Sequence, residues 1–365
     1  MSNHVDIAVI GAGIAGASIA AELASHGSVL LAEAERFPGY HSTGRSAAFW
    51  DECYGGPQVV PLTLASGEWL RQGGFLGARG ALHIAHDGQE AALDAFERTF
   101  ADSGATIERV GRAGMEALIP GLLPGWNAAI GEPHCADIDV AALHQHYLRE
   151  ARRGGVTLIT GHRLASAKRS GGLWHLGFDN GAEVITGTLV NAAGAWADEV
   201  AQIAGCRPIG ITPYRRTVVQ LRTDPVPDAA LPLVLGIDGS FYFKPDSGRV
   251  WLSPHDETPS SACDVAPEEL DVALAIDRFQ QVVGWQVQAV ERKWAGLRSF
   301  APDRLPVYGA DPECDGFFWF AGQGGFGIQT APAAARLAAQ LLTGAERDGI
   351  TGSLDASVYS PARFG

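Results

Sequence analysis

The N-terminal segment contains the feature that most constrains the fold, a glycine turn between an apolar strand and a short apolar helix. Val5–Ile10 form a β-branched run typical of a strand buried on both faces of a parallel sheet. The turn follows directly, with the sequence G-A-G-I-A-G at residues 11–16. A small apolar helix then extends to about Gly27, and Val29–Ala32 resume as a second strand. The segment is therefore predicted to form a complete β-turn-α-β unit.

Each glycine of this turn has a physical task in binding a dinucleotide. Gly11 permits the tight turn, Gly13 lets a diphosphate approach the backbone, and Gly16 allows the helix to lie close on the strand. The diphosphate then lies at the helix N-terminus. Glu33 ends the second strand, where an acid accepts hydrogen bonds from ribose hydroxyls. The complete unit favours a dinucleotide site over a chance glycine turn. The expected contacts are Gly11, Gly13, Ile14, Ala15, Glu33 and Ala34.

A second segment indicates which dinucleotide binds. Residues 40–48 read Y-H-S-T-G-R-S-A-A, small hydroxyl side chains around one arginine. A polar loop that caps a helix is the alternative interpretation. With this segment the chain resembles the D-amino-acid oxidase and glycine oxidase superfamily of FAD enzymes, and within it bacterial D-arginine dehydrogenase. The resemblance implies that FAD is contacted by Ser42, Thr43, Arg45, Ser46 and Ala47.

Further motifs extend the resemblance over essentially the whole chain. Residues 191–198 read N-A-A-G-A-W-A-D and look like a second cofactor-approach motif, and the backbone of Leu164 would meet adenine. Residues 323–330 open a helix with a glycine loop that would lie beside the flavin pyrimidine ring, although a purely structural turn stays open. The implied contacts are Ala193, Gly194, Trp196, Gly324, Gly325, Phe326, Gly327, Ile328 and Gln329. No cysteine lies in a covalent-attachment motif, so we expect non-covalent FAD.

The expected fold class is α/β, a Rossmann-like FAD-binding domain with a second α+β substrate domain built on an antiparallel sheet. We assign residues 1–56, 139–206 and 291–365 to the FAD-binding domain. Residues 57–138 and 207–290 would form the substrate domain, which covers the reactive face of the flavin.

Composition narrows the partners. The formal net charge of −14 disfavours nucleic acid and anionic membranes, because both need a basic surface. The five cysteines are odd in number and scattered, without a C-x-x-C pair. This argues against a disulfide framework or a metal site and suits a reducing cytoplasm. We read neither a signal peptide nor a membrane-spanning helix, so we predict a cytoplasmic enzyme without membrane insertion.

Flavin chemistry requires chiefly that the substrate be held and water excluded. A substrate carboxylate is best held by arginine, whose planar fork binds two oxygens, aided by tyrosine hydroxyls. Arg215, Tyr242 and Arg298 fit this need, and Tyr54 matches an active-site tyrosine of the family. Arg298 would also contact FAD. Either Arg215 or its neighbour Arg216 could instead face solvent, and Tyr242 could belong to the core.

Specificity is where the chain departs from D-arginine dehydrogenase. The glutamate and histidine that this enzyme has near its substrate correspond to Ala81 and Phe49. Without the acid a substrate guanidinium would be buried unpaired, so we expect D-arginine to be a poor substrate. The expected substrate pocket comprises Phe49, Asp51, Ala81, His83, Leu233, Leu235 and Gly325. It favours uncharged or hydrophobic D-amino acids, although Asp51 and His83 leave room for a polar side chain.

Three functions are compatible with these residues. The first is oxidation of a D-amino acid by hydride transfer from Cα to flavin N5, which yields an imino acid and then a 2-oxo acid and ammonia. The second is oxidation of an N-methyl or cyclic secondary amine, as with sarcosine or proline. The third is a non-catalytic flavoprotein. The expected partners are a small amino acid or amine and an unknown electron acceptor, with oxidase and dehydrogenase both open.

Overall fold

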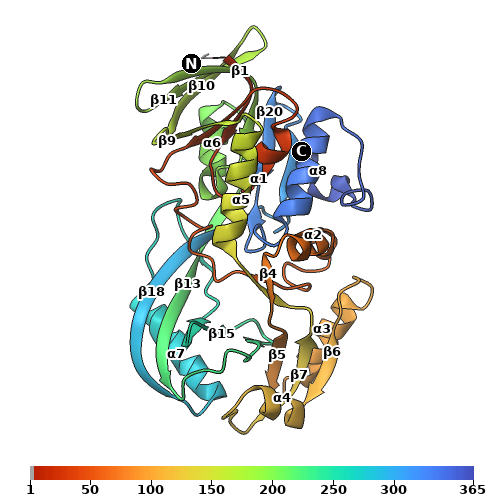
Figure 1. Ribbon diagram of the computed structural model, residues 1–365, viewed down its shortest axis with the longest axis vertical. Coiled ribbons are helices and arrows are strands. Elements are labelled where there is room, and N and C mark those ends of the chain that lie inside the picture. Colours follow the sequence, from red (N-terminus) through yellow and green to blue (C-terminus); the bar gives the residue numbers. More distant parts are fainter. Residues whose placement is uncertain (1–3) are drawn as a thin grey trace.

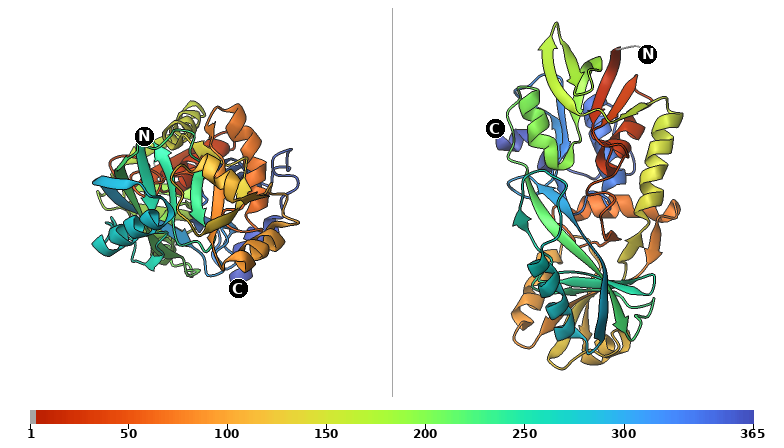
Figure 2. Two further views of the ribbon diagram at one scale, coloured as in Figure 1. Left: turned by 90° about the horizontal axis from the view of Figure 1, so that it is seen from below. Right: turned by 90° about the vertical axis from the view of Figure 1, so that its left-hand side faces the viewer.

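The computed structural model describes residues 4–365 and contains two large sheets at opposite ends of an elongated molecule (Figure 1). The first sheet lies at one end, and the C-terminus lies beside it. The second lies at the other end, and the long strands β13 (Thr212–Asp224) and β18 (Gln286–Phe300) reach from it toward the first (Figure 2).

The first sheet has eight strands around a parallel centre. Four parallel pairings join β12 to β1, β1 to β2, β2 to β9 and β12 to β20. Antiparallel strands β10, β11 and β19 complete the edges. The strands are β1 (His4–Ile10), β2 (Val29–Glu33), β9 (Thr157–Thr160), β10 (Leu164–Ser170), β11 (Leu173–Phe178), β12 (Glu183–Asn191), β19 (Val307–Ala310) and β20 (Phe317–Ala321).

Alternate side chains of β1 enter two different cores, as expected for a strand covered on both faces. Ile7 and Val9 pack under helices α1 (Ile14–Leu23), α5 (Val140–Arg153) and α8 (Ala331–Thr343). Ala8 and Ile10 pack on the opposite side, against α6 (Ala197–Ile203) and strands β10 and β11. The β1–α1–β2 unit predicted from the glycine turn is therefore confirmed.

The second sheet has ten strands and is antiparallel except for the pairing of β5 with β14. Helix α7 (Glu269–Val282) covers one face, where Phe279 packs against Phe243 and Leu252. Helices α3 (Glu90–Phe100) and α4 (Arg112–Leu118) flank the other end. The remaining strands are β5 (Ala81–His86), β6 (Glu108–Gly111), β7 (Trp126–Glu132), β14 (Leu233–Gly236), β15 (Tyr242–Asp246), β16 (Arg249–Ser253), β17 (Thr258–Pro259) and β21 (Gln323–Gly324).

A small sheet and one helix join the two halves. Strands β3 (Phe49–Trp50) and β4 (Leu76–Ala78) pair with β8 (Ala136–Ile138). Helix α2 (Val60–Gln72) places Leu62 in the core of the first sheet. Helix α2 therefore packs on the first sheet, and the domain boundary at residue 57 stays a prediction. Three short 3-10 helices span Gly194–Trp196, Ala356–Tyr359 and Pro361–Phe364.

Over residues 4–365, no helix has the length and apolar character needed to cross a membrane.

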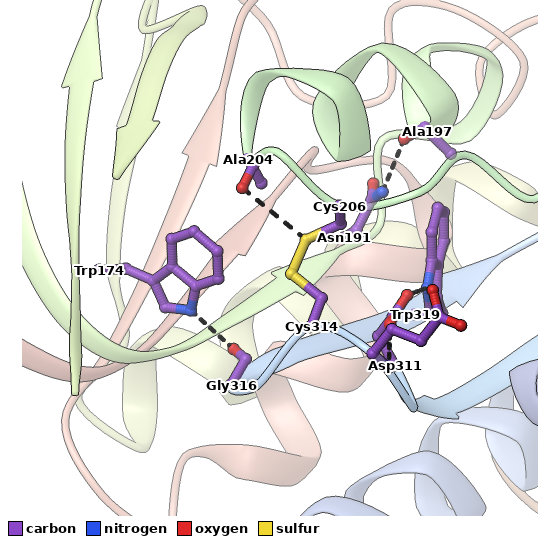
Figure 3. The surroundings of a disulfide bond; sticks show 10 residues. Trp174, Asn191, Ala197, Ala204, Cys206, Asp311, Cys314, Gly316 and Trp319 are labelled. Carbon is purple, nitrogen blue, oxygen red and sulfur yellow. Dashed lines mark hydrogen bonds between the residues drawn. A yellow bond between two sulfur atoms is a disulfide. The ribbon is translucent and has the colours of Figure 1, made fainter. Parts of the chain in front are cut away.

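The expectation that the cysteines form no disulfide is wrong for one pair. Cys206, which follows α6, is bonded to Cys314, which precedes β20 (Figure 3). The two residues are 108 positions apart, so their proximity depends on the order of strands in the sheet and not on local spacing. Cys53, Cys135 and Cys263 are free thiols. The cytoplasmic location stays a prediction.

The disulfide closes a long loop, and removing it is expected to destabilise the first sheet. Cys206→Ser should lower the free energy of unfolding by about 2–4 kcal/mol, because the unfolded chain regains the entropy that the cross-link removes. Denaturant unfolding of the FAD-loaded protein measures the change. Cys263→Ser, which alters a free and partly exposed thiol, should shift it by less than about 0.5 kcal/mol. Equal stability of the two variants would contradict the prediction.

Candidate active site

A long cavity runs from the glycine turn after β1 to the facing ends of β13 and β18. At one end it is bordered by Glu33, Leu164 and Ile203. At the other end its wall includes Arg298 and Tyr242. The cavity therefore connects the carboxyl ends of the parallel strands with the second sheet.

The glycine turn is as tight as its sequence predicts. Gly11 has φ +98°, and a Cβ there would lie 2.6 Å from the carbonyl oxygen of Ala192. A Cβ on Gly16 would lie 1.7 Å from the carbonyl oxygen of Gly11. Neither position can accept a side chain without moving backbone. The first N–H groups of α1 consequently face the cavity without partners of their own in the helix.

Two side chains brace this turn from the cavity wall. Glu33 accepts a hydrogen bond from the Ala12 N–H at 2.7 Å and from the Glu35 N–H at 2.9 Å, one on each carboxylate oxygen. Because each oxygen has a second lone pair, a ribose hydroxyl can still donate to it. Thr43 Oγ accepts from the Ile14 N–H at 3.0 Å. The polar segment after β2 is thus joined directly to the start of α1.

His144 also supports the turn, although its place in the sequence does not indicate this role. Its Nε2 donates to the carbonyl oxygen of Ala12 at 2.9 Å, and burial lowers the pKa of the ring. The side chain reaches from α5 under the turn, an arrangement that depends on how α5 packs against α1.

The same polar segment is also tied to the second sheet. Ser42 Oγ donates to the carbonyl oxygen of Leu297 at 2.6 Å, and Arg45 donates to that of Ala295 at 3.2 Å. Arg45 also pairs with Asp264 at 2.5 Å. The arginine therefore lines the cavity while most of its donors are engaged by protein atoms.

At the far end, three residues meet around one space. Arg298 Nη1 donates to the hydroxyl of Tyr54. A Cβ on Gly325 would lie 1.9 Å from this hydroxyl and 3.0 Å from the Arg298 guanidinium carbon. The glycine is therefore required for Tyr54 and Arg298 to approach the loop before α8.

Arg216 occupies the position that we expected for Arg215. Its side chain is 3% exposed on the cavity wall, and its Nη1 has no hydrogen-bond partner anywhere in residues 4–365. Its Nε donates to the carbonyl oxygen of Asp256 at 2.8 Å, and its Nη2 to Glu257 at 3.1 Å. Burial, and then the like charge of Arg298, lower the pKa of Arg216 to about 10, so it stays cationic at neutral pH.

Arg215 does not line the cavity, so the prediction that it binds the substrate carboxylate is wrong. Its guanidinium pairs with Glu268 and, at 2.8 Å, with Asp271, both at the start of α7. Successive residues of a strand point to opposite faces, so only one of two neighbouring arginines can face the cavity. In β13 that residue is Arg216, and Val218 lines the same wall.

Tyr242 shows the same alternation, but here the expected side chain faces the cavity. Phe241 and Phe243 enter the core under α7, whereas Tyr242 lines the cavity. Its hydroxyl is buried and has no partner within the described part of the chain.

Most of the expected apolar pocket forms a layer behind the cavity wall. Phe49, Ala81, Leu233 and Leu235 do not line the cavity but pack in one cluster with Ala47, Val218 and Tyr242, which do. The ring centroid of Phe49 lies 5.9 Å from that of Tyr54 and 5.6 Å from that of Tyr242. These residues therefore set the position of the wall without forming it.

Phe326 and Gln329 are also displaced from the expected position beside FAD. Phe326 packs against Val59 and Phe300 in a buried cluster. Gln329 is 1% exposed and bonds to both backbone groups of Asp51, accepting from its N–H at 3.2 Å and donating to its oxygen at 3.0 Å. The glycine loop thus faces the cavity through Gly324, Gly325, Gly327 and Ile328, while the side chains of Phe326 and Gln329 are buried away from it.

Asp51 and His83 lie behind the wall with Glu132, which the sequence analysis did not single out. These three buried residues form the one group within residues 4–365 whose side chains could together bind a metal.

The structure brings most of the expected residues to the cavity. Those that line it are Gly11, Gly13, Ile14, Ala15, Glu33, Ala34, Ser42, Thr43, Arg45, Ser46, Ala47, Leu164, Ala193, Gly194, Trp196, Tyr242, Arg298, Gly324, Gly325, Gly327 and Ile328. Those that do not are Phe49, Asp51, Tyr54, Ala81, His83, Arg215, Leu233, Leu235, Phe326 and Gln329. Lining residues that were not expected include Tyr40, Arg163, Glu199, Ile203, Arg216, Val218 and Ser299.

The shape and chemistry of the cavity fit FAD. Its glycine turn leaves room for a diphosphate against the start of α1, and Glu33 is available to ribose. The far end ends among cationic and aromatic side chains beside a second glycine loop, which suits a flavin ring and a bound anion.

Comparison with protein families identifies a match over almost the whole chain. Residues 6–341 match the family model described as DAO, FAD dependent oxidoreductase. The hydrogen cyanide synthase subunit HcnC of Pseudomonas aeruginosa is 30% identical over 187 residues, which cover 51% of this chain and 44% of that protein. The chain therefore aligns with less than half the length of this relative.

Two solved structures share the fold. Glycine oxidase from Geobacillus kaustophilus has a TM-score of 0.83 at 23% identity, with 98% of both chains covered. L-Proline dehydrogenase from P. horikoshii has a TM-score of 0.85 at 24% identity, covering 98% of this chain and 97% of that chain. The predicted α/β fold with its second, largely antiparallel sheet is confirmed.

The flavin is expected to leave the protein on denaturation. The free thiols of Cys53, Cys135 and Cys263 are absent from the cavity wall, so none is placed to bond the ring. Acid precipitation of the purified holoprotein should release essentially all of the yellow colour into the supernatant. Flavin fluorescence that migrates with the polypeptide on a denaturing gel would contradict this expectation.

Proposed function

The chain belongs to the DAO family of FAD-dependent oxidoreductases, and on this premise we propose that it oxidises a D-amino acid with an uncharged or hydrophobic side chain. When bound, FAD accepts the hydride that leaves the carbon beside the substrate nitrogen. The imino acid formed would hydrolyse to a 2-oxo acid and ammonia.

The observation that carries this proposal is the set of donors at the far end of the cavity. Arg216 has a buried Nη1 without a partner, and Tyr242 has a buried hydroxyl without one, counting every residue from 4 to 365. Arg298 and Tyr54 meet beside them at Gly325. Buried donors without partners are costly, so this arrangement favours a ligand that supplies acceptors. A carboxylate bound by the two guanidinium groups meets that need.

The same charges bear on the state of the amine. Two guanidinium groups disfavour a further positive charge nearby, which favours binding of the neutral amine over the ammonium form. Only the neutral amine has a free nitrogen lone pair to support loss of hydride from the adjacent carbon. The arginines would therefore both hold the carboxylate and help to select the reactive protonation state.

The layer behind the wall supports an uncharged substrate side chain. Phe49, Leu233 and Leu235 keep this region apolar. Asp51 and His83, the polar members of the expected pocket, are instead bonded within their own cluster. A substrate guanidinium would find no free carboxylate on this side.

A second candidate is oxidation of a secondary amine. It is favoured by the fold similarity to an L-proline dehydrogenase, whose named substrate is a cyclic secondary amine. A carboxylate clamp would serve such a substrate equally well.

A panel of amines mixed anaerobically with the holoprotein distinguishes these functions. We expect uncharged D-amino acids to bleach the flavin absorbance fastest, and D-arginine at least about tenfold more slowly because its guanidinium would be buried unpaired. Ammonia as product supports amino-acid oxidation, whereas formaldehyde or a cyclic imine supports the second candidate. Failure of every compound to bleach the flavin would contradict both and indicate a non-catalytic flavoprotein.

The two neighbouring arginines provide a matched test of the carboxylate site. Arg216→Ala should raise KM about tenfold to a hundredfold, because a hydrogen-bonded ion pair with the substrate contributes roughly 1.5–3 kcal/mol. Arg215→Lys keeps a cation beside Glu268 and Asp271, and it should leave KM unchanged. Steady-state kinetics with the best substrate measure both. An increase in KM for Arg215→Lys equal to that for Arg216→Ala would contradict the assignment.

A further inference from the structure

Three buried ionisable side chains lie directly beneath the segment that carries Tyr54. Asp51 follows β3, His83 lies on β5 and Glu132 ends β7, and they are 1%, 8% and 1% exposed. Their potential ligand atoms all lie within 4.8 Å of one another. These side chains do not line the FAD cavity, and they are separate from Arg216 and Arg298, which are proposed to bind the carboxylate.

Hydrogen bonds connect this cluster to the backbone before Tyr54. Asp51 Oδ1 accepts from the N–H groups of Cys53 and Tyr54, each at 2.9 Å. Glu132 Oε2 accepts from the same Cys53 N–H at 3.1 Å. Glu132 Oε1 lies 2.6 Å from His83 Nε2. The two carboxyl groups therefore hold the turn that ends at Tyr54.

The cluster favours retention of a proton. Burial, and then the charge of Glu132, raise the pKa of Asp51 well above its usual value, while burial raises the pKa of Glu132 to about 7. Burial lowers the pKa of His83, so the ring is neutral. Two buried carboxylates this close cannot both be charged cheaply. Other ionisable groups around the cluster are Glu52 with His134, Cys53, Cys135, Asp137 and Lys244.

The position of Tyr54 depends on this turn. Its hydroxyl is bonded to Arg298 and fills the space beside Gly325. Gln329 clamps both backbone groups of Asp51, so the turn is also fixed to the start of α8. Movement of the turn would be transmitted to the tyrosine and to the arginine it contacts.

We propose that Asp51 and Glu132 are positioning residues that share one proton and thereby hold Tyr54 against Arg298, so that loss of this proton to solvent weakens carboxylate binding. The inference rests on the proposed function, because it assumes that Arg298 and Tyr54 bind a carboxylate. Burial and the charge of Glu132 raise the pKa of Asp51 well above its usual value, so the last proton of the pair is kept at neutral pH and the turn is held. When this proton leaves at higher pH, two like charges face each other and the turn relaxes.

A metal is a poorer occupant of this cluster than a proton. Asp51 Oδ1 already accepts two N–H groups, and Glu132 accepts one on Oε2 and faces His83 on Oε1. A cation would have to displace these bonds and release the turn. A shared proton keeps them.

Binding of benzoate to the oxidised holoprotein tests the proposal, since benzoate has a carboxylate but no amine to oxidise. For the wild type we expect the Kd, followed by the change in flavin absorbance, to rise about tenfold as the pH is raised from about 7 to about 9. Glu132→Gln and Asp51→Asn replace a carboxyl by a neutral amide of the same shape, and both should bind with a Kd that is nearly independent of pH. Glu116→Gln, in an exposed ion pair on α4, is the control and should follow the wild type.

Hydrogen exchange of the segment 51–56 provides a readout that does not need a ligand. After correction for intrinsic rates, exchange in the wild type should accelerate as the pH is raised from about 7 to about 9, and in Glu132→Gln it should not. The same pH dependence in wild type and both amide variants, or a stoichiometric divalent metal at the cluster, would overturn the proposal. Exchange that changes as expected in a protein that binds no benzoate at any pH would contradict the proposed function while supporting the role of the cluster in holding Tyr54.

Discussion

The structure depends on one close backbone contact, that between Gly16 of the first helix and the carbonyl oxygen of Gly11. A Cβ on Gly16 would lie 1.7 Å from that oxygen, so only glycine lets α1 begin immediately after β1. This contact directs the start of the helix into the cavity. Glu33 and Thr43 then bond to the N–H groups of Ala12 and Ile14, which fixes the turn to the next two segments of the chain.

The two long strands carry this arrangement to the substrate end. Tyr214 of β13 pairs with Arg298 of β18, and Arg216 pairs with Gly296. The two arginines therefore lie on neighbouring strands, two residues apart in the register. Ser42 bonds to the backbone of Leu297 on β18. The cofactor-binding segment and the anion-binding wall are therefore parts of one connected structure.

Local patterns predicted the features that arise from local physics. The β1–α1–β2 unit follows from glycine spacing, and the small residues around Thr43 and Gly325 line the cavity. The sequence alone does not show that Arg216, and not Arg215, faces the cavity. Which of the two side chains does so depends on the register of β13 and on the acids at the start of α7. Nor could Glu132 be expected from its surroundings in the sequence.

The remaining differences arise from contacts between distant segments. Cys206 and Cys314 meet only because β12 pairs with β20, a consequence of the crossover order of the sheet. His144 reaches Ala12 because α5 packs against α1. Phe326 points into a buried cluster because the glycines of its loop take the cavity side. Each needs a tertiary arrangement that neighbouring residues do not encode.

The alternation along β13 has a consequence for how such a protein can change. Deleting one residue within this strand would exchange the side chains of its two faces, bringing an arginine surrounded by acids toward the ligand and burying the other beneath α7. Deleting two would preserve the facing sides while shifting every partner along the strand. Insertions or deletions of an odd number of residues near residue 212 would therefore change which arginine faces the ligand, whereas those of an even number would not.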